Sequence, residues 1–225
     1  MISNRALIEK LMREGHLKSR RIIEAFQQID RARFVPVELK HKAYLNEPLP
    51  IGFNQTMSQP LVVAFMLELL DPRPGERILE IGAGSGWKTA LLAHILESKH
   101  DVGRKADSHL GAGQVVAIER IKQLYEKAVK NVSQFDFIKR GTAAIVHGDG
   151  SKGYAEKAPF DKIISAAAGT FVPSAWKDQV AVGGRIVVPI EDSIKVLEKH
   201  SPIDFRVVEY SGFRFVPLIS GSNGG

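Results

Sequence analysis

The sequence predicts an α/β protein built on a doubly wound, mostly parallel sheet, with helices before the sheet and antiparallel strands after it. Short apolar runs alternate with helical segments over residues 77–190, which is the pattern of parallel strands joined by crossover helices. A glycine-rich turn joins the first of these runs to the helix that follows it. We expect one domain over 1–225, made of N-terminal helices and a loop (1–60), a core (61–190) and C-terminal strands (191–225).

Two amphipathic helices are expected near the N-terminus. Apolar residues recur there at the spacing of one helix face: Leu7, Ile8, Leu11 and Met12, then Ile22, Ile23, Phe26 and Ile29. The segment 44–60 carries prolines and a glycine at intervals, so we expect a long loop rather than a regular element. Loops of this length in compact domains are usually functional.

The core is expected to alternate between strands and helices. Apolar residues predict a helix over 61–70, which the sequence PRPG ends. The runs that predict buried strands are RILEI (77–81), VVAIE (115–119), AAIVH (143–147), DKIISAAA (161–168) and GGRIVVPI (183–190). Helices are expected over 87–96 and 121–135. The tail, 194–219, alternates as VLEKH, FRVVEY and FRFVPLI, which predicts antiparallel strands at one edge.

The composition excludes several classes of protein. The chain contains no cysteine, which rules out disulfides, thiolate metal sites and a thiol nucleophile, and we expect no metal site. We find no apolar run long enough for a signal peptide or a membrane span, so we expect a cytoplasmic location and no membrane partner. The net charge is +6, but the basic residues are spread along the chain. We therefore expect a solvated basic surface and no nucleic-acid partner. We also expect a monomer.

The glycine-rich turn LEIGAGSGW (79–87) leaves a predicted strand and enters a predicted helix, the context in which such a turn binds a ligand. Its spacing is G-x-G-x-G, and Trp87 stands where a dinucleotide fingerprint has its third glycine. Glu80, just before the turn, would repel a pyrophosphate but suits a cationic ligand. S-adenosylmethionine carries a sulfonium and an ammonium group, so the charge pattern favours this cofactor.

Two further acidic residues follow the next two predicted strands. Glu119 ends VVAIE, where a carboxylate binds ribose hydroxyls, and Asp149 follows AAIVH, where it can accept a bond from an adenine amino group. The polar segment 98–114 is expected to be an exposed insertion, which explains why Glu119 lies further along the chain than is usual. Three acids at three successive strand ends favour a nucleoside-containing cofactor.

The segment PLPIGFNQTMSQP (48–60) resembles the active-site loop of the protein-L-isoaspartate O-methyltransferases. The similarity continues through RFVP, ILEIGAGSGW, VVAIERI, HGDG, APFDKIISAAA, VPSAWKDQVAVGGRIVVPI and FRFVPLI. This resemblance implies a class I methyltransferase, Rossmann-like fold that uses S-adenosylmethionine. It also implies methyl transfer to the α-carboxylate of L-isoaspartyl residues in damaged peptides and proteins, a step that initiates repair.

The resemblance assigns roles residue by residue. Ser58 matches the family's active-site serine, and Thr56 matches the threonine beside it in the substrate site. The residues that match the cofactor site are Glu80, Gly82, Gly84, Ser85, Glu119, Gly148, Asp149 and Gly150. Gln179 is expected to flank the peptide. The chain departs from the family pattern at Asn46, Asn54 and Trp87, of which Asn54 tolerates unusual backbone angles better than most residues.

The reaction needs no general base, because an α-carboxylate with a pKa of roughly 3.5 is already ionised at neutral pH. Positioning is then the main contribution to catalysis, and Ser58 is expected to orient the carboxylate by a hydrogen bond. A helix N-cap before residues 61–70 is the alternative role for Ser58. For the whole chain, the alternatives are an RNA methyltransferase of the same core fold, a catalytically silent S-adenosylmethionine-binding protein and, on weaker grounds, an NAD-dependent enzyme.

Overall fold

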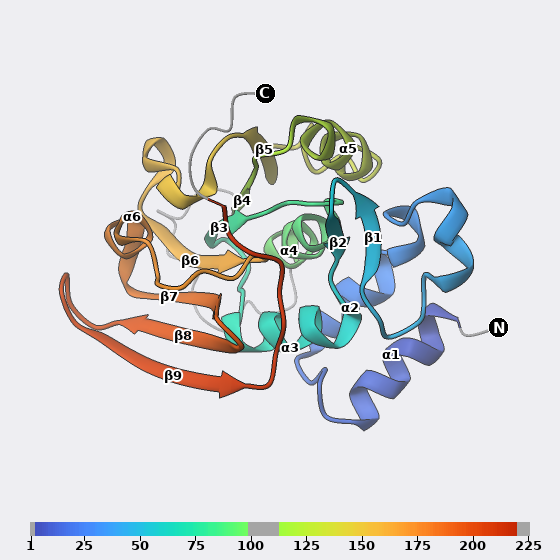
Figure 1. Ribbon diagram of the computed structural model, residues 1–225, viewed down its shortest axis with the longest axis horizontal. Helices are drawn as coiled ribbons and strands as arrows, with labels where there is room; N and C mark the ends of the chain where they lie inside the picture. The colour runs from blue at the N-terminus through green and yellow to red at the C-terminus, as the bar shows by residue number, and fades with distance from the viewer. Residues whose placement is uncertain (1–2, 99–112, 220–225) are drawn as a thin grey trace.

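A computed structural model describes residues 3–98 and 113–219 (Figure 1). The expected insertion at 98–114 therefore lies almost wholly outside the described residues. Within the two described ranges, no helix is both long enough and apolar enough to cross a membrane.

A seven-stranded sheet forms the centre of the fold, in the order β5-β4-β3-β6-β7-β8-β9 (Figure 1). Its strands are β3 (Arg77–Ile81), β4 (Gln114–Glu119), β5 (Ala143–His147), β6 (Phe160–Ser165), β7 (Val180–Ile190), β8 (Ser193–Lys199) and β9 (Phe205–Ser211). The first five in that order are parallel, and β8 and β9 are antiparallel. The chain runs outward from β3 to β5 and then returns to β6 on the other side of β3. This is the predicted doubly wound sheet.

The central strand β3 is apolar because helices cover both faces of the sheet. Successive residues of a strand point to opposite faces. Ile78 accordingly packs in one hydrophobic cluster with Val115, whereas Leu79 packs in a second cluster with Val116. The first cluster also holds side chains from the N-terminal helices, and the second holds Trp176.

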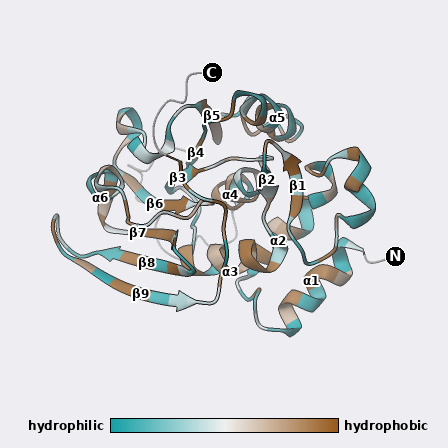
Figure 2. Cartoon of the chain, viewed as in Figure 1, coloured by the Kyte–Doolittle hydropathy of each residue, from teal (hydrophilic) through white to brown (hydrophobic). Residues whose placement is uncertain are grey.

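Six α-helices lie in the described ranges: α1 (Asn4–Arg13), α2 (Arg20–Gln28), α3 (Pro60–Leu70), α4 (Trp87–Glu97), α5 (Lys122–Ser133) and α6 (Ser174–Gln179). Four short 3-10 helices accompany them: η1 (Arg31–Arg33), η2 (Val37–Lys42), η3 (Gly150–Lys152) and η4 (Ala155–Lys157). Helix α4 packs on β4, α5 packs on β4 and β5, and α6 packs on β7, while α2 packs on α4. Peripheral helices such as α1 carry both hydrophilic and hydrophobic residues, and Leu7, Ile8 and Leu11 of α1 are buried (Figure 2).

Two elements differ from the prediction. The segment expected to be a loop contains an antiparallel hairpin of β1 (Leu49–Gly52) and β2 (Gln55–Met57). Its turn residues Phe53 and Asn54 have positive φ angles of 56° and 55°, and asparagine tolerates this conformation well. The last predicted strand, FRFVPLI, is absent from the sheet. It leaves the edge after β9 and makes one isolated bridge to Ala168 through Pro217, a residue with no backbone N–H for a ladder.

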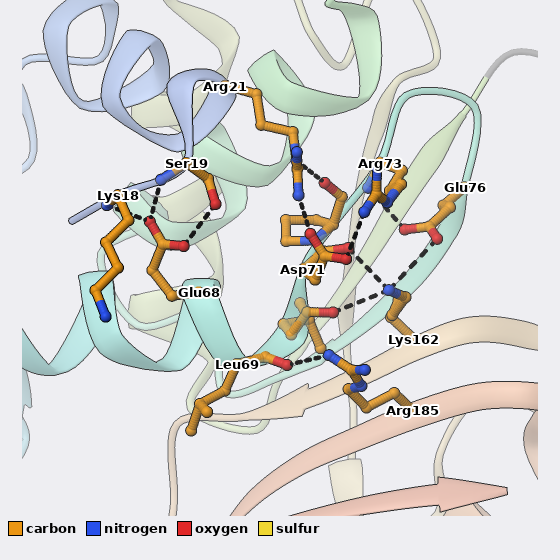
Figure 3. Close-up of polar contacts among 12 residues, drawn as sticks. Lys18, Ser19, Arg21, Glu68, Leu69, Asp71, Arg73, Glu76, Lys162 and Arg185 are labelled. Carbon is orange, nitrogen blue, oxygen red and sulfur yellow. Dashed lines mark hydrogen bonds and ion pairs between the residues drawn. The ribbon is translucent and has the colours of Figure 1, made fainter. Parts of the chain in front are cut away.

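The C-terminal end of α3 is surrounded by cationic side chains (Figure 3). Lys162 donates to the carbonyl oxygens of Leu70 and Asp71 at 2.9 and 2.8 Å, and Arg185 donates to Leu69 O at 2.6 Å. Arg21 also forms an ion pair with Asp71. The last carbonyl groups of a helix have no partner within the helix and carry partial negative charge, so these cations satisfy them.

Candidate active site

A cavity of about 320 Å³ lies at the carboxyl ends of β3, β4 and β6, where the chain order of the sheet reverses. Ligands bind at this position in open α/β sheets. The cavity is also lined by the β1–β2 hairpin, the start of α3 and the segment 214–219. It brings together these predicted site residues: Thr56, Ser58, Glu80, Gly82, Gly84, Ser85, Glu119 and Gly150.

The glycine-rich turn forms the floor of the cavity between β3 and α4. Gly86, the residue before α4, has a φ of 85°, and a Cβ there would lie 2.8 Å from Val132 Cγ2. Only glycine combines that backbone angle with so close an approach. The turn is also fixed to α5, because Asn131 Nδ2 donates to Ser85 O at 2.9 Å.

Glu119 projects from the end of β4 and is 6% exposed. Its Oε2 accepts a hydrogen bond from Gly84 N at 2.9 Å, and its Oε1 accepts one from Ile121 N at 3.0 Å. These two bonds fix the carboxylate at the mouth of the glycine turn. A carboxylate has about four lone-pair sites, so both oxygens can still accept the hydroxyl groups of a ribose.

Glu80 is fully buried below the turn, and it has a partner that the sequence argument overlooked. Lys88 Nζ lies 3.7 Å from Glu80 Oε1, and Thr89 Oγ1 donates to Glu80 Oε2 at 2.6 Å. Burial raises the pKa of Glu80 and lowers that of Lys88, while each group opposes the shift of the other. The negative charge of Glu80 is thus balanced inside the protein, which weakens our charge argument for a cationic ligand. A lysine within the mostly apolar helix WKTALLAHIL was the available signal.

Ser58 lines the cavity with an uncommitted hydroxyl group. The N-cap residue of α3 is Gln59, and Asn46 Oδ1 accepts the hydrogen bond from Leu61 N at 3.0 Å. Within residues 3–98 and 113–219, the Ser58 hydroxyl makes no hydrogen bond. The helix-cap alternative for Ser58 is therefore wrong, since Asn46 provides the cap and leaves the serine hydroxyl available to a ligand.

Arg31 holds the loop that carries Ser58, a role that no sequence pattern indicated. Its guanidinium is fully buried and donates to the carbonyl oxygens of Ala43, Leu45, Glu47 and Ser58 at 2.8, 3.1, 3.0 and 3.2 Å. Burial lowers the pKa of Arg31 to about 10. The five fixed donors of arginine allow one side chain to bind several carbonyl groups. The only signal in the sequence is the position of Arg31 shortly before the RFVP segment.

The structure does not bring every predicted site residue to the cavity. The amide of Gln179 accepts from Tyr154 N at 2.6 Å and donates to Lys152 O at 2.9 Å, so it joins α6 to the loop beyond β5. We therefore remove Gln179 from the substrate site, a correction of the prediction. Gly148 and Asp149 lie next to the cavity-lining Gly150, and Asp149 Oδ1 accepts from Ser151 N at 3.0 Å.

Comparisons with known proteins agree with this geometry. The model of the family described as protein-L-isoaspartate(D-aspartate) O-methyltransferase matches residues 2–223. A protein-L-isoaspartate O-methyltransferase of Staphylothermus marinus is 41% identical over 222 residues, covering 96% of this chain and 93% of its own. One from Yersinia enterocolitica is 39% identical over 217 residues, covering 96% and 95%.

Solved structures show the same fold. A Plasmodium falciparum protein-L-isoaspartate O-methyltransferase, in complex with S-adenosyl-L-homocysteine, superposes with a TM-score of 0.82 at 22% identity, covering 96% of this chain and 98% of its own. A second structure with the same enzyme name has a TM-score of 0.79 at 26% identity and covers 98% and 67%.

The doubly wound sheet, the glycine-rich turn and the acid at the end of the next strand define a class I, S-adenosylmethionine-dependent methyltransferase. Within this class, the chain belongs to the protein-L-isoaspartate(D-aspartate) O-methyltransferase family. The predictions of fold class, family, enzyme class and cofactor are confirmed by these comparisons.

Proposed function

We propose that this chain uses S-adenosylmethionine to methylate the free α-carboxylate of L-isoaspartyl residues, the first step in the repair of damaged proteins. One observation carries the residue assignment. The cavity places the uncommitted Ser58 hydroxyl, from the loop QTMSQP, in the same space as the glycine-rich turn and Glu119. A methyl donor and a carboxylate acceptor can therefore meet in one cavity.

The residues present fit the cofactor. Each carboxylate oxygen of Glu119 accepts one hydrogen bond and can accept another from a ribose hydroxyl. The glycine-rich turn permits close approach of the ligand to the backbone. Among the described residues, Glu80 Oε1 is buried and accepts no hydrogen bond, so a donor from the cofactor or a water would satisfy it. Gly150 forms the wall at the end of β5, where a Cβ would lie 2.6 Å from Ile81 Cγ2. We assign Glu80, Gly82, Gly84, Ser85, Glu119 and Gly150 to cofactor binding, with Gly148 and Asp149 beside them.

The protein's contribution to the reaction is positioning. The bound cofactor supplies an electrophilic methyl group. The substrate carboxylate is ionised at neutral pH, so no residue needs to remove a proton. Ser58 would donate a hydrogen bond to one oxygen of the substrate carboxylate and so orient the group, and Thr56 lines the same wall from β2. Arg31 and Asn46 fix the loop, because they bond Ser58 O and the first turn of α3.

Methyl transfer to a matched pair of short peptides tests the proposed function. One peptide contains L-isoaspartate and the other contains normal aspartate at the same position, and the methyl group of S-adenosylmethionine is labelled. We expect base-labile label on the isoaspartyl peptide alone. Label on neither peptide, despite saturable binding of S-adenosylhomocysteine, would leave a catalytically silent binding protein and overturn the proposal.

Ser58→Ala tests the assigned role of the hydroxyl. We expect kcat to fall about 100-fold, the order of effect that a misplaced reacting group produces. The Kd for S-adenosylhomocysteine should stay at the wild-type value, since the hydroxyl binds the substrate. Ser133→Ala, at the exposed end of α5, is the matched control. Loss of cofactor binding in the Ser58 variant would instead assign a structural role to the serine.

We also propose that the chain acts as a single-domain monomer. One family model spans residues 2–223, which supports the single domain. Light scattering should give a mass near 24.8 kDa, and a mass of about twice that value would overturn this proposal. The cytoplasmic location expected from the sequence stays a prediction.

A further inference from the structure

Among the residues that the structure describes, three cationic side chains line the active-site cavity: Lys88, Arg120 and Arg214. Two of them are assigned to the cofactor side of the cavity, one by its partner and one by its position. Lys88 is paired with Glu80. The Arg120 guanidinium makes no hydrogen bond or ion pair with the described residues, but Arg120 directly follows Glu119 at the end of β4, on the side proposed for the ribose. Arg214 is exposed, and within residues 3–98 and 113–219 its guanidinium makes no hydrogen bond or ion pair. An unpaired guanidinium in the wall of a substrate cavity is available to an anionic ligand.

Arg214 lies on the segment of the chain that crosses the cavity after β9. Figure 1 shows this segment, in red, running from the side of α3 across the carboxyl ends of the central strands. On one side of Arg214, the ring of Phe213 stacks on Phe65 of α3 with centroids 5.2 Å apart. On the other side, Val216 O accepts a hydrogen bond from Ala168 N at 2.8 Å. The backbone that carries Arg214 is therefore fixed at both ends.

The contact of Phe213 with α3 ties the Arg214 segment to the helix that follows Ser58. Helix α3 begins two residues after Ser58, and its Val62 lines the same cavity as Ser58 and Arg214. The proposed ribose site at Glu119 belongs to β4, which is separated from β6 by β3. The segment that carries Arg214 is therefore held by α3 and by the residues after β6, and not by β4.

We propose that Arg214 is a substrate-binding residue that pairs with the α-carboxylate of the isoaspartyl residue and distinguishes it from the neutral methyl ester. This inference rests on the proposed function. The guanidinium matches a carboxylate with two parallel N–H donors, and Ser58 supplies a further donor to the same group. Arg214 selects for the anionic substrate and releases the neutral product.

The charge change in the reaction decides which kinetic constant Arg214 controls. The carboxylate is converted into a neutral ester: an oxygen–carbon bond forms, the carbon–sulfur bond breaks and its electron pair stays on sulfur. The negative charge on the carboxylate has partly disappeared in the transition state, so a guanidinium pairs best with the ground state. Removing an interaction of this kind raises KM and leaves kcat unchanged or higher.

The carboxylate that Arg214 binds has two possible sources, the peptide and the methionine moiety of the cofactor. Binding measurements separate them. We use two variants. Arg214→Met removes the charge, and Arg214→Lys keeps the charge but lacks the two parallel N–H donors of the guanidinium. Arg13→Met, at the exposed end of α1, is the control. The ligands are S-adenosylhomocysteine, an L-isoaspartyl peptide, and the same peptide with an α-carboxamide in place of the carboxylate.

We expect the wild type, saturated with S-adenosylhomocysteine, to bind the carboxylate peptide about tenfold more tightly than the carboxamide, as one charge-assisted pair would give. Arg214→Met should bind both peptides equally, and Arg214→Lys should retain part of the preference. In turnover assays, Arg214→Met should raise KM for the peptide about tenfold without lowering kcat. Arg13→Met should match the wild type in every measurement.

Two results would overturn the inference while leaving the proposed function intact. In one, an active Arg214→Met enzyme keeps the wild-type preference for the carboxylate peptide. In the other, the variant binds S-adenosylhomocysteine about tenfold more weakly and keeps that preference, which would assign Arg214 to the cofactor carboxylate. A wild-type enzyme that methylates no isoaspartyl peptide would overturn the proposed function itself.

Discussion

At the scale of single residues, buried charges decide the geometry of the site. Lys88 and Arg31 are both buried next to the cavity, and each interacts with other protein groups rather than with solvent. Lys88 balances Glu80, and Arg31 binds four carbonyl oxygens of the active-site loop. Removing one member of a buried pair is more damaging than replacing both, because it leaves an uncompensated charge or unsatisfied polar groups.

Lys88→Met should destabilise the protein by about 3–5 kcal/mol at pH 8, because it leaves Glu80 without its cation. Burial already raises the pKa of Glu80, and loss of Lys88 raises it further. A carboxyl whose folded pKa lies above its unfolded value of about 4.3 contributes stability at low pH and loses it as the pH rises through the folded value. The deficit relative to wild type should therefore be smaller at pH 5 than at pH 8 in urea unfolding.

The double variant Lys88→Met with Glu80→Gln is the check on this explanation. It removes both charges, so it should recover much of the lost stability and show no pH-dependent deficit. Lys130→Met, on the exposed side of α5, should change stability by less than about 0.5 kcal/mol. An equal deficit at both pH values in Lys88→Met would refute the charge-pair explanation.

Arg31→Lys should lower stability by about 3 kcal/mol although the charge is retained, because one ammonium cannot bond all four carbonyl groups. The loop 43–58 should then be cleaved faster in limited proteolysis. Arg33→Lys is the matched control, since Arg33 lies at the surface over the ring of Phe135 at 4.4 Å. Equal cleavage rates in the two variants would contradict the role assigned to Arg31.

At the scale of elements, α3 connects the active-site loop to strands β6 and β7. Its first turn is capped by Asn46 and lies directly after Ser58. Its last turn is held by Lys162 and Arg185 from β6 and β7 (Figure 3). Asp71 ends the helix with a φ of 52°. Contacts on the side of the sheet away from the cavity therefore fix the helix that positions Ser58.

Lys162→Met should lower the free energy of unfolding by about 2–3 kcal/mol, because two buried carbonyl groups lose a charged donor. The first turn of α3 should also become less well fixed, so kcat should fall several-fold while the Kd for S-adenosylhomocysteine stays constant. Lys157→Met, an exposed lysine on the same side of the sheet as Arg77, is the control. Unfolding in urea and single-turnover assays provide the two measurements. A wild-type free energy of unfolding for Lys162→Met would argue against the network.

At the scale of the whole molecule, the cavity is assembled from distant parts of the sequence. The hairpin of β1 and β2, the ends of β3 and β4, and the segment 214–219 all contribute to its wall. Ligand binding therefore couples the N-terminal third, the central sheet and the C-terminal tail. A ligand that binds only the folded state stabilises the whole cooperative unit by mass action.

S-adenosylhomocysteine at 100 times its Kd should stabilise the protein by about 2.7 kcal/mol and raise Tm by roughly 5–10 °C. Glu119→Gln should reduce this shift by at least half at the same ligand concentration, because it weakens the proposed bonds to the ribose. Glu126→Gln, exposed on α5, should leave the shift unchanged. A full shift in the Glu119 variant would remove Glu119 from the cofactor site.

The sequence by itself determined the elements whose physics is local. The strands RILEI and VVAIE are continuous apolar runs, and the glycines of 82–86 permit a turn that few other residues can adopt. The motif QTMSQP indicated Ser58 as a site residue, because a short contiguous motif can be recognised without knowledge of the fold.

Only the tertiary structure decided which groups become partners across the chain. The pairing of Lys88 with Glu80, the four carbonyl contacts of Arg31 and the place of Gln179 outside the cavity depend on side chains that the fold brings together. The tertiary structure also decided the path of residues 213–219. This segment has the periodicity of a strand, but it leaves the sheet and pairs with the loop at Ala168. Periodicity records how a segment is buried, whereas a polar contact depends on distances that only the folded chain defines.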